Sequence, residues 1–148
     1  MSAEGELFQV IVVVPGQPRG WGRATPIIIA GRARMITDRK TRSEEGAIRS
    51  IASAAMGARL PYDGAIILRL CAYRTVPTSF SKAKRAAALA GEILPTTKPD
   101  VDNYAKMIDA LNGVVWLDDS LIATAVIHKR YSDQPRLVID VRSFADAA

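Results

Sequence analysis

One stretch of this chain, residues 65–74, constrains the fold more than any other because its polarity alternates. Every second position is apolar, and the intervening positions are mixed. A period of two is that of a β-strand with one fully buried face. Such a strand needs other elements packed on its apolar face, so the rest of the chain must supply them. That face comprises Ile66, Leu68, Leu70 and Ala72.

Four further segments have the composition of strands. Residues 7–14 form a β-rich run ended by Pro15-Gly16, and we expect a strand there that is buried on both faces or nearly so. A short strand at 27–29 interrupts a loop, and two final strands are expected at 121–130 and 136–142. With the alternating strand they make a sheet of about five strands.

Three helices complete the pattern. Thr41-Arg42-Ser43-Glu44 has the form of a capping box, which predicts a helix from about 41 to 58. An alanine-rich helix is expected to begin around Ser81, and an apolar stripe predicts a third helix over 101–112. We therefore predict a single α/β (α+β) domain spanning all 148 residues, with helices packed against a mixed sheet.

Composition limits the possible functions. The chain has 148 residues, 49% of them hydrophobic, which suits one domain with a substantial core. No apolar run approaches the roughly 20 residues that span a bilayer, and the N-terminus is acidic and polar, so we expect a cytoplasmic protein without a membrane partner. Cys71 and His128 are the only residues of their types, which excludes an intrachain disulfide and a zinc site of nitrogen and sulfur ligands. Oxygen ligands remain, and they favour Mg²⁺ or Mn²⁺.

Positive charge gathers in residues 19–42 of a chain whose formal net charge is +5. Seven basic residues in this segment stand against one acid, Asp38, so the local net charge is +6. Arginine predominates, as suits bidentate phosphate contacts, although a solvated surface is the alternative. The candidates for contacts with a DNA backbone are Arg19, Arg23, Arg32, Arg34, Arg39 and Lys40.

Negative charge gathers farther along the chain, where five aspartates and one lysine give a local net charge of −4. Carboxylates so close together repel one another unless they take up a proton or bind a cation. An acidic pocket in a basic protein suggests a divalent cation acting on a polyanion, most commonly nucleic acid. The five are Asp100, Asp102, Asp109, Asp118 and Asp119.

Local structure offers a simpler explanation for part of this cluster. Asp100 is expected to be the N-cap of the third helix, and Asp102 with Lys106 would form an i,i+4 ion pair worth about 0.3–0.5 kcal/mol. That explanation does not extend to Asp118-Asp119, an acidic pair with apolar residues on both sides, because unpaired charge at the edge of a core is costly.

The predicted helix and the segment that follows it allow three carboxylates to meet. At ~1.5 Å per helical residue and ~3.3 Å per extended residue, the chain after Gly113 returns about as far as the helix rises. Asp119 can then lie beside Asp100 and Asp102, and the three could hold one Mg²⁺ or bridge two. Lys106, on the same side as Asp102, would point toward the phosphate.

These residues also resemble the signature of a known family. The run from Lys98 to Lys106 reads K-P-D-V-D-N-Y-A-K, and it is followed by D-A-L-N-G from Asp109 and W-L-D-D-S from Trp116. The pattern closely resembles that of the RusA family of Holliday junction resolvases, small endonucleases that cut four-way DNA junctions. Pro15-Gly16-Gln17-Pro18 is similar as well, so the resemblance extends over most of the chain.

The resemblance implies roles and an assembly. Asp100, Asp102 and Asp119 match the family's metal-binding catalytic aspartates, and Lys106 matches its essential lysine. It further implies a Mg²⁺-dependent homodimer, with Mn²⁺ as a possible substitute, that nicks two opposing strands of branched DNA in recombination and repair. The dimer interface is expected at an exposed sheet edge or on the apolar face around Ile66, Leu68 and Leu70.

Two other classes of function remain open. The chain could be a non-catalytic, structure-specific DNA-binding protein whose aspartates serve only as caps and ion pairs. It could also be a metal-dependent phosphotransferase that acts on a small nucleotide. The second class would require a glycine loop that cradles phosphate, and the sequence contains none.

Overall fold

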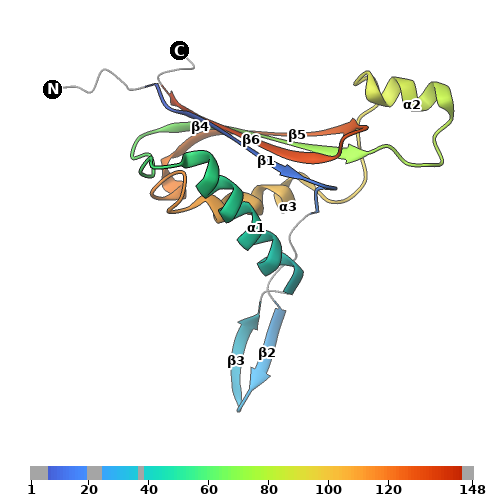
Figure 1. The fold of residues 1–148 in the computed structure, drawn as a ribbon. Helices are drawn as coiled ribbons and strands as arrows, with labels where there is room; N and C mark the ends of the chain where they lie inside the picture. The colour runs from blue at the N-terminus through green and yellow to red at the C-terminus, as the bar shows by residue number, and fades with distance from the viewer. Residues whose placement is uncertain (1–6, 20–24, 37–38, 145–148) are drawn as a thin grey trace.

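The computed structural model describes residues 7–19, 25–36 and 39–144. At residues 25–27, 29, 34–36 and 39–41 it describes the backbone alone. Within these ranges the chain forms one mixed sheet with helices on one side, and a separate hairpin that projects away from them (Figure 1).

The main sheet has four strands in the order β1-β6-β4-β5. Strand β4 runs parallel to β5, whereas β6 is antiparallel to both β1 and β4. The predicted mixed sheet is therefore confirmed, but the predicted strand at 27–29 belongs to a second, two-stranded sheet, and its partner strand was not anticipated. The main-sheet strands are β1 (Gln9–Pro15), β4 (Ile66–Thr75), β5 (Ile122–Ser132) and β6 (Arg136–Ser143), and the hairpin strands are β2 (Thr25–Ile29) and β3 (Arg32–Ile36).

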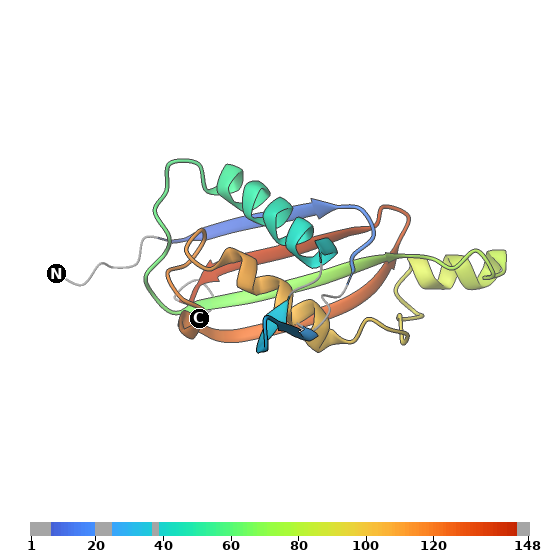
Figure 2. The same cartoon turned by 90° about the horizontal axis from the view of Figure 1, so that it is seen from below.

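Two helical segments cover one face of the main sheet, as Figures 1 and 2 show from two directions. One is α1 (Arg39–Met56), and the other is α3 (Val101–Ala105), which continues as the 3₁₀ helix η1 (Lys106–Leu111). A short 3₁₀ turn, η2 (Asp119–Leu121), precedes β5. Helix α2 (Lys82–Leu89) lies beyond the end of the sheet and does not cover its face.

The apolar face of β4 forms the centre of the core. Ile66, Leu68, Leu70 and Ala72 are all fully buried, as the alternation predicted. They pack beneath the helices together with Tyr104 of α3 and residues of α1 and η1. Because helices already cover this face, it cannot be the dimer interface, and that expectation was wrong.

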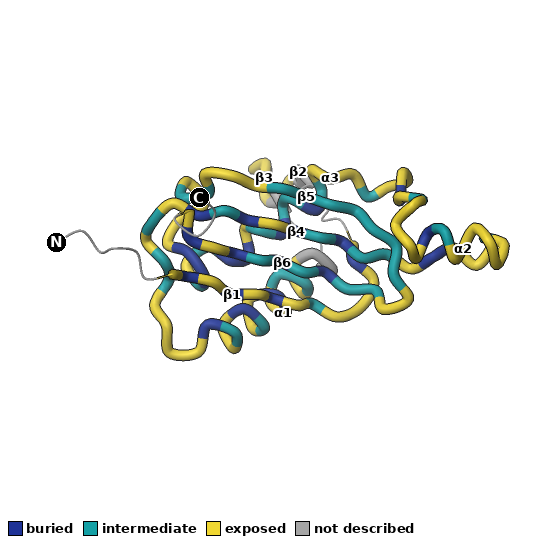
Figure 3. The backbone as a smooth tube through the Cα atoms, turned by 90° about the horizontal axis from the view of Figure 1, so that it is seen from above, coloured by how far each residue is buried: buried dark blue, intermediate teal, exposed yellow. Residues whose placement is uncertain are grey.

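No helix covers the opposite face of the sheet, and the residues that alternate with the core positions are exposed or only partly buried (Figure 3). For this reason the prediction that the first strand is buried on both faces was also wrong. Along β1, Val10 and Val12 point into the core, whereas Ile11 and Val13 are 50% and 44% exposed. Strand β1 is an edge strand of a sheet with helices on one side only, so alternate residues reach solvent.

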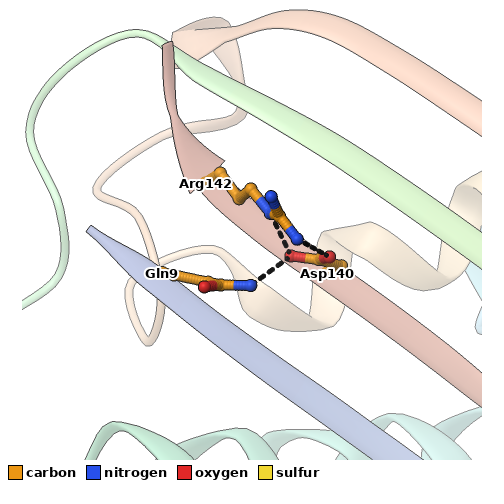
Figure 4. A network of polar contacts seen from close by, with 3 residues as sticks. All are labelled: Gln9, Asp140 and Arg142. Carbon is orange, nitrogen blue, oxygen red and sulfur yellow. Dashed lines mark hydrogen bonds and ion pairs between the residues drawn. The ribbon is translucent and has the colours of Figure 1, made fainter. Parts of the chain in front are cut away.

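A polar network occupies this open face at the pairing of β1 with β6. The Arg142 guanidinium donates to both carboxylate oxygens of Asp140, at 3.2 and 3.1 Å, and the Gln9 amide lies 3.4 Å from the same carboxylate (Figure 4). These charged side chains keep contact with solvent because no helix covers this face of the sheet.

Helix ends agree with the sequence in part. Helix α2 begins directly after Ser81, as expected, and Ser81 caps it by accepting a hydrogen bond from the Lys84 backbone N–H at 3.1 Å. Helix α1 begins at Arg39, so Thr41 lies inside the helix and the predicted capping box is wrong. The third helix has the expected extent but changes from α to 3₁₀ at Lys106, which brings positions three apart into line and buries Met107 and Ala110 against the core.

Candidate active site and nucleic-acid interface

The segment before α3 is fixed to the main sheet by two cationic side chains. The Arg74 guanidinium, from the end of β4, donates to the carbonyl oxygens of Thr97 and Lys98 at 3.3 and 2.8 Å. Lys129, from β5, donates to the same Thr97 carbonyl at 2.6 Å. Because Arg74 and Lys129 bind backbone carbonyls, they hold this segment against the sheet independently of its own side chains. They thereby position the start of α3.

Asp100 and Asp102 stand at that beginning with exposed side chains. Asp100 holds the N-cap position in extended conformation, yet its carboxylate accepts no capping hydrogen bond. Asp102 forms no ion pair with Lys106, whose ammonium donates instead to the Asn103 amide oxygen at 3.2 Å. The simpler explanation, a cap and an i,i+4 pair, is therefore wrong for these two carboxylates, and within the described ranges neither is neutralised by the fold.

The segment that leads to the acidic pair is anchored by a buried tryptophan. The Trp116 indole N–H donates to the Asn112 amide oxygen at 2.5 Å, and the Trp116 carbonyl accepts from the Gly113 N–H at 2.7 Å. Backbone bonds from Tyr62 to Val115 and from Leu117 to Tyr62 join this turn to the segment after α1. The return is therefore a compact turn and not the extended segment assumed from the sequence.

The two aspartates of the pair have different structural roles. Asp118 caps η2, because its carboxylate accepts from the Ser120 backbone N–H at 3.2 Å. Hydrogen bonds from the Ser120 side chain, and then from the backbone N–H groups of Ser120 and Asp119, lower the pKa of Asp118. Asp119 is the first residue of η2 and is exposed. Asp118 thus supports the turn, which leaves Asp119 as the member free to interact with a ligand.

Asp109 adds a further acidic position that sequence reasoning did not include in the site. Partial burial of its carboxyl raises the pKa of Asp109, and the negative charges of Asp119 and Glu45 raise it further. Glu45 comes from α1, so this neighbourhood depends on tertiary packing that no local motif reveals. The sequence did offer one indication of this role, because Asp109 belongs to the cluster of five aspartates.

Among the residues described, no three His, Cys, Asp or Glu side chains are gathered closely enough to hold a metal ion. The acidic neighbour that the structure gives for Asp119 is Asp109, which also has Glu45 nearby. The donor chemistry nevertheless fits a hard divalent cation, since Asp100, Asp102 and Asp119 offer exposed carboxylate oxygens. Their assignment as metal ligands stays a prediction.

The predicted DNA-contacting residues fall around the hairpin and the start of α1. Arg19 and Arg32 are exposed, and Arg19 lies 3.8 Å from the carboxylate of Glu44. Arg23 lies outside the described residues. The remaining three, whose backbone is described but whose side chains are not, are Arg34 in β3 and Arg39 and Lys40 in α1.

No helix in the described part of the chain has the length and apolar character needed to cross a membrane.

Comparison with known proteins identifies the family. A model of the family described as "Endodeoxyribonuclease RusA" matches residues 15–142. The chain is also 34% identical over 132 residues to "Uncharacterized protein YqaN" of Bacillus subtilis (strain 168), a match that covers 87% of this chain and 92% of that relative. Both matches include the aspartate segment and the hairpin, and they agree with the motif resemblance. This chain therefore belongs to the RusA family of endodeoxyribonucleases.

Proposed function

We propose that this protein is a Mg²⁺-dependent endonuclease that resolves four-way DNA junctions by paired nicks, in DNA recombination and repair in the cytoplasm. Family membership supports nuclease activity, and one structural observation supports the site. The carboxylates of Asp100 and Asp102 are exposed at the start of a helix that uses neither for capping or ion pairing.

In this proposal Asp100, Asp102 and Asp119 hold the cation, with Mn²⁺ as a possible substitute. When bound, such a cation supplies an activated water and neutralises charge on the scissile phosphate. Arg74 and Lys129 keep the start of α3 in place, since they hold the two residues before Pro99. Each of the three carboxylates is at the surface, where a phosphodiester can approach.

Lys106 would stabilise negative charge that develops on the phosphate or the leaving oxygen. Its ammonium is part-buried and already oriented by Asn103, so little side-chain entropy remains to be lost when the phosphate arrives. Arg19 and Arg32, with the other basic residues around the hairpin, would contact the DNA backbone and place the junction without reading its bases.

We further propose that the active species is a homodimer, because two equivalent sites on a two-fold axis suit two opposing strands. Two sheet edges, β1 and β5, remain available for the interface. Exposed Ile11 and Val13 extend the β1 edge onto the open face and supply apolar area there.

The main alternative is a non-catalytic DNA-binding protein. The lack of three assembled carboxylates among the described residues is the observation that favours it. An incubation experiment distinguishes the nuclease from the binding protein. The protein is incubated with labelled four-way junction or linear duplex, in Mg²⁺ or in EDTA. Cutting of the junction in Mg²⁺ alone supports the enzyme, whereas binding without cutting under both conditions would contradict it.

A further inference from the structure

The β2–β3 hairpin stands away from the sheet and the helices as an arm (Figure 1). Its strands pair over five positions, from Thr25 with Ile36 to Ile29 with Arg32. Ala30 and Gly31 join them with positive φ angles of 52° and 75°, the conformation of a tight two-residue hairpin turn. A two-stranded hairpin alone is at best marginally stable in water, so an arm of this kind gains order when a partner covers it.

The end of the arm carries an exposed aliphatic side chain. Ile28 is 79% exposed and pairs with Ala33, which is exposed as well. Register places these two residues on the same face of the hairpin, one pair before the turn. A single exposed isoleucine is ordinary on a protein surface, but here it lies near the tip of a hairpin that projects away from the sheet and the helices (Figure 1).

Charge decides what kind of partner fits the arm. Between Arg19 and Ile36 the sequence contains four arginines and no acidic residue. Arg32 is exposed directly beside the turn. The arm would repel the same positive arm of a second copy, whereas a polyanion complements it. A two-stranded ribbon also matches the width of a DNA groove.

The arm lies on the functional side of the molecule. Figures 1 and 2 show that it extends from the side of the sheet that α1 and α3 cover. Asp100 and Asp102 lie on that same layer, at the start of α3. DNA placed across the aspartates would therefore have the hairpin beside it.

We propose that the hairpin inserts into the junction, with Ile28 entering between bases at the branch point and Arg32 contacting a phosphate beside it. This inference rests on the proposed junction substrate, and it names Ile28 as the residue that opens the branch point of that junction. Aliphatic side chains can act as wedges that enter between base steps and partly unstack them. The wedge would hold the branch point open while the carboxylates reach the strands.

The test uses the full-length protein and a four-way junction with 2-aminopurine at the branch point, in Ca²⁺ so that binding is followed without cutting. Unstacking raises the fluorescence of 2-aminopurine. We expect a rise on saturation with the wild type, a rise at least twofold smaller with Ile28→Ala, and a wild-type rise with Ile28→Leu. Duplex affinity should be the same for all three proteins.

Leu60→Ala is the matched control, because Leu60 is an aliphatic residue exposed to a similar extent, 85%, outside the hairpin. It should behave as the wild type. Arg32→Ala should weaken binding to junction and duplex alike and reduce the log–log salt slope by about 0.9.

Three results would overturn the inference. An undiminished fluorescence rise with Ile28→Ala would refute the wedge while leaving the nuclease proposal intact. Conversion of a wild-type dimer to a monomer by Ile28→Ala, measured by light scattering, would show that the arm binds a second copy. Failure of the wild type to bind any junction would refute the wedge and the proposed function together.

Discussion

Replacing Asn112 by alanine should loosen the turn that carries Asp119. The Asn112 amide oxygen accepts from the indole N–H of Trp116, and Trp116 is fully buried. Alanine leaves that donor without a partner inside the core, which costs about 1–3 kcal/mol of unfolding free energy. For a chain of this length the loss corresponds to roughly 2–4 °C in Tm per kcal/mol.

Urea unfolding followed by tryptophan fluorescence measures the loss, and Asn112→Asp is the matched control because it keeps an acceptor at the same position. We expect Asn112→Ala to be less stable than Asn112→Asp, and its junction cleavage to be slower at a temperature where both are folded. A loss below about 0.5 kcal/mol, the range of ordinary surface substitutions, would refute the claim that this hydrogen bond anchors the turn.

Three further predictions concern charge and assembly. Lys106→Ala should lower the cleavage rate far more than it weakens junction binding, because one lysine is a single phosphate contact among many but acts on transition-state charge; a loss confined to affinity would make it an ordinary backbone contact. Folding raises the pKa of Asp109, so the ionised carboxylate is less favourable in the folded state than in the unfolded state. The stability of the fold therefore falls as the pH rises through these two pKa values, whereas below the unfolded pKa the carboxyl is protonated in both states and has no such effect. Asp109→Asn should accordingly raise stability in urea at pH 7 but not at pH 3, and no gain at pH 7 would contradict this assignment. Light scattering at micromolar protein should detect a dimer that Ile11→Asp weakens, and symmetric resolution by a wild-type monomer would eliminate the dimer.

The sequence was most informative where local chemistry and tertiary packing agree. The alternation at 65–74 identified the central strand and its buried face, and Ser81 identified the start of α2. The exposed face of β1 could not be predicted, because burial depends on whether a helix covers that side. The hairpin was half predicted, since Ile27-Ile28-Ile29 indicates a strand but its partner, rich in arginine, does not.

The candidate site shows the same division. Motif spacing selected Asp100, Asp102, Lys106 and Asp119, but the distance between them depended on how the chain returns after Gly113. The chain after Gly113 folds as a turn around Trp116, and about half of the helix is 3₁₀. The length of the helix and the length of the segment that follows it therefore do not match in the way that was estimated for an α-helix and an extended chain. The position of Glu45 near Asp109 arises from packing of α1 and lies beyond any local motif.

The central claim is that Asp102 is a metal ligand of a junction nuclease, and cleavage by Asp102→Asn tests it most directly. The side chain is exposed and unpaired in the fold, so the substitution should leave stability and junction binding unchanged. Residues that merely support metal ligands change activity by about 10–100-fold, so loss of a ligand should slow Mg²⁺-dependent cutting by more than about 100-fold. Paired nicks by the wild type in Mg²⁺, absent in EDTA and in the variant, are the predicted result. Near wild-type cutting by Asp102→Asn would contradict the account.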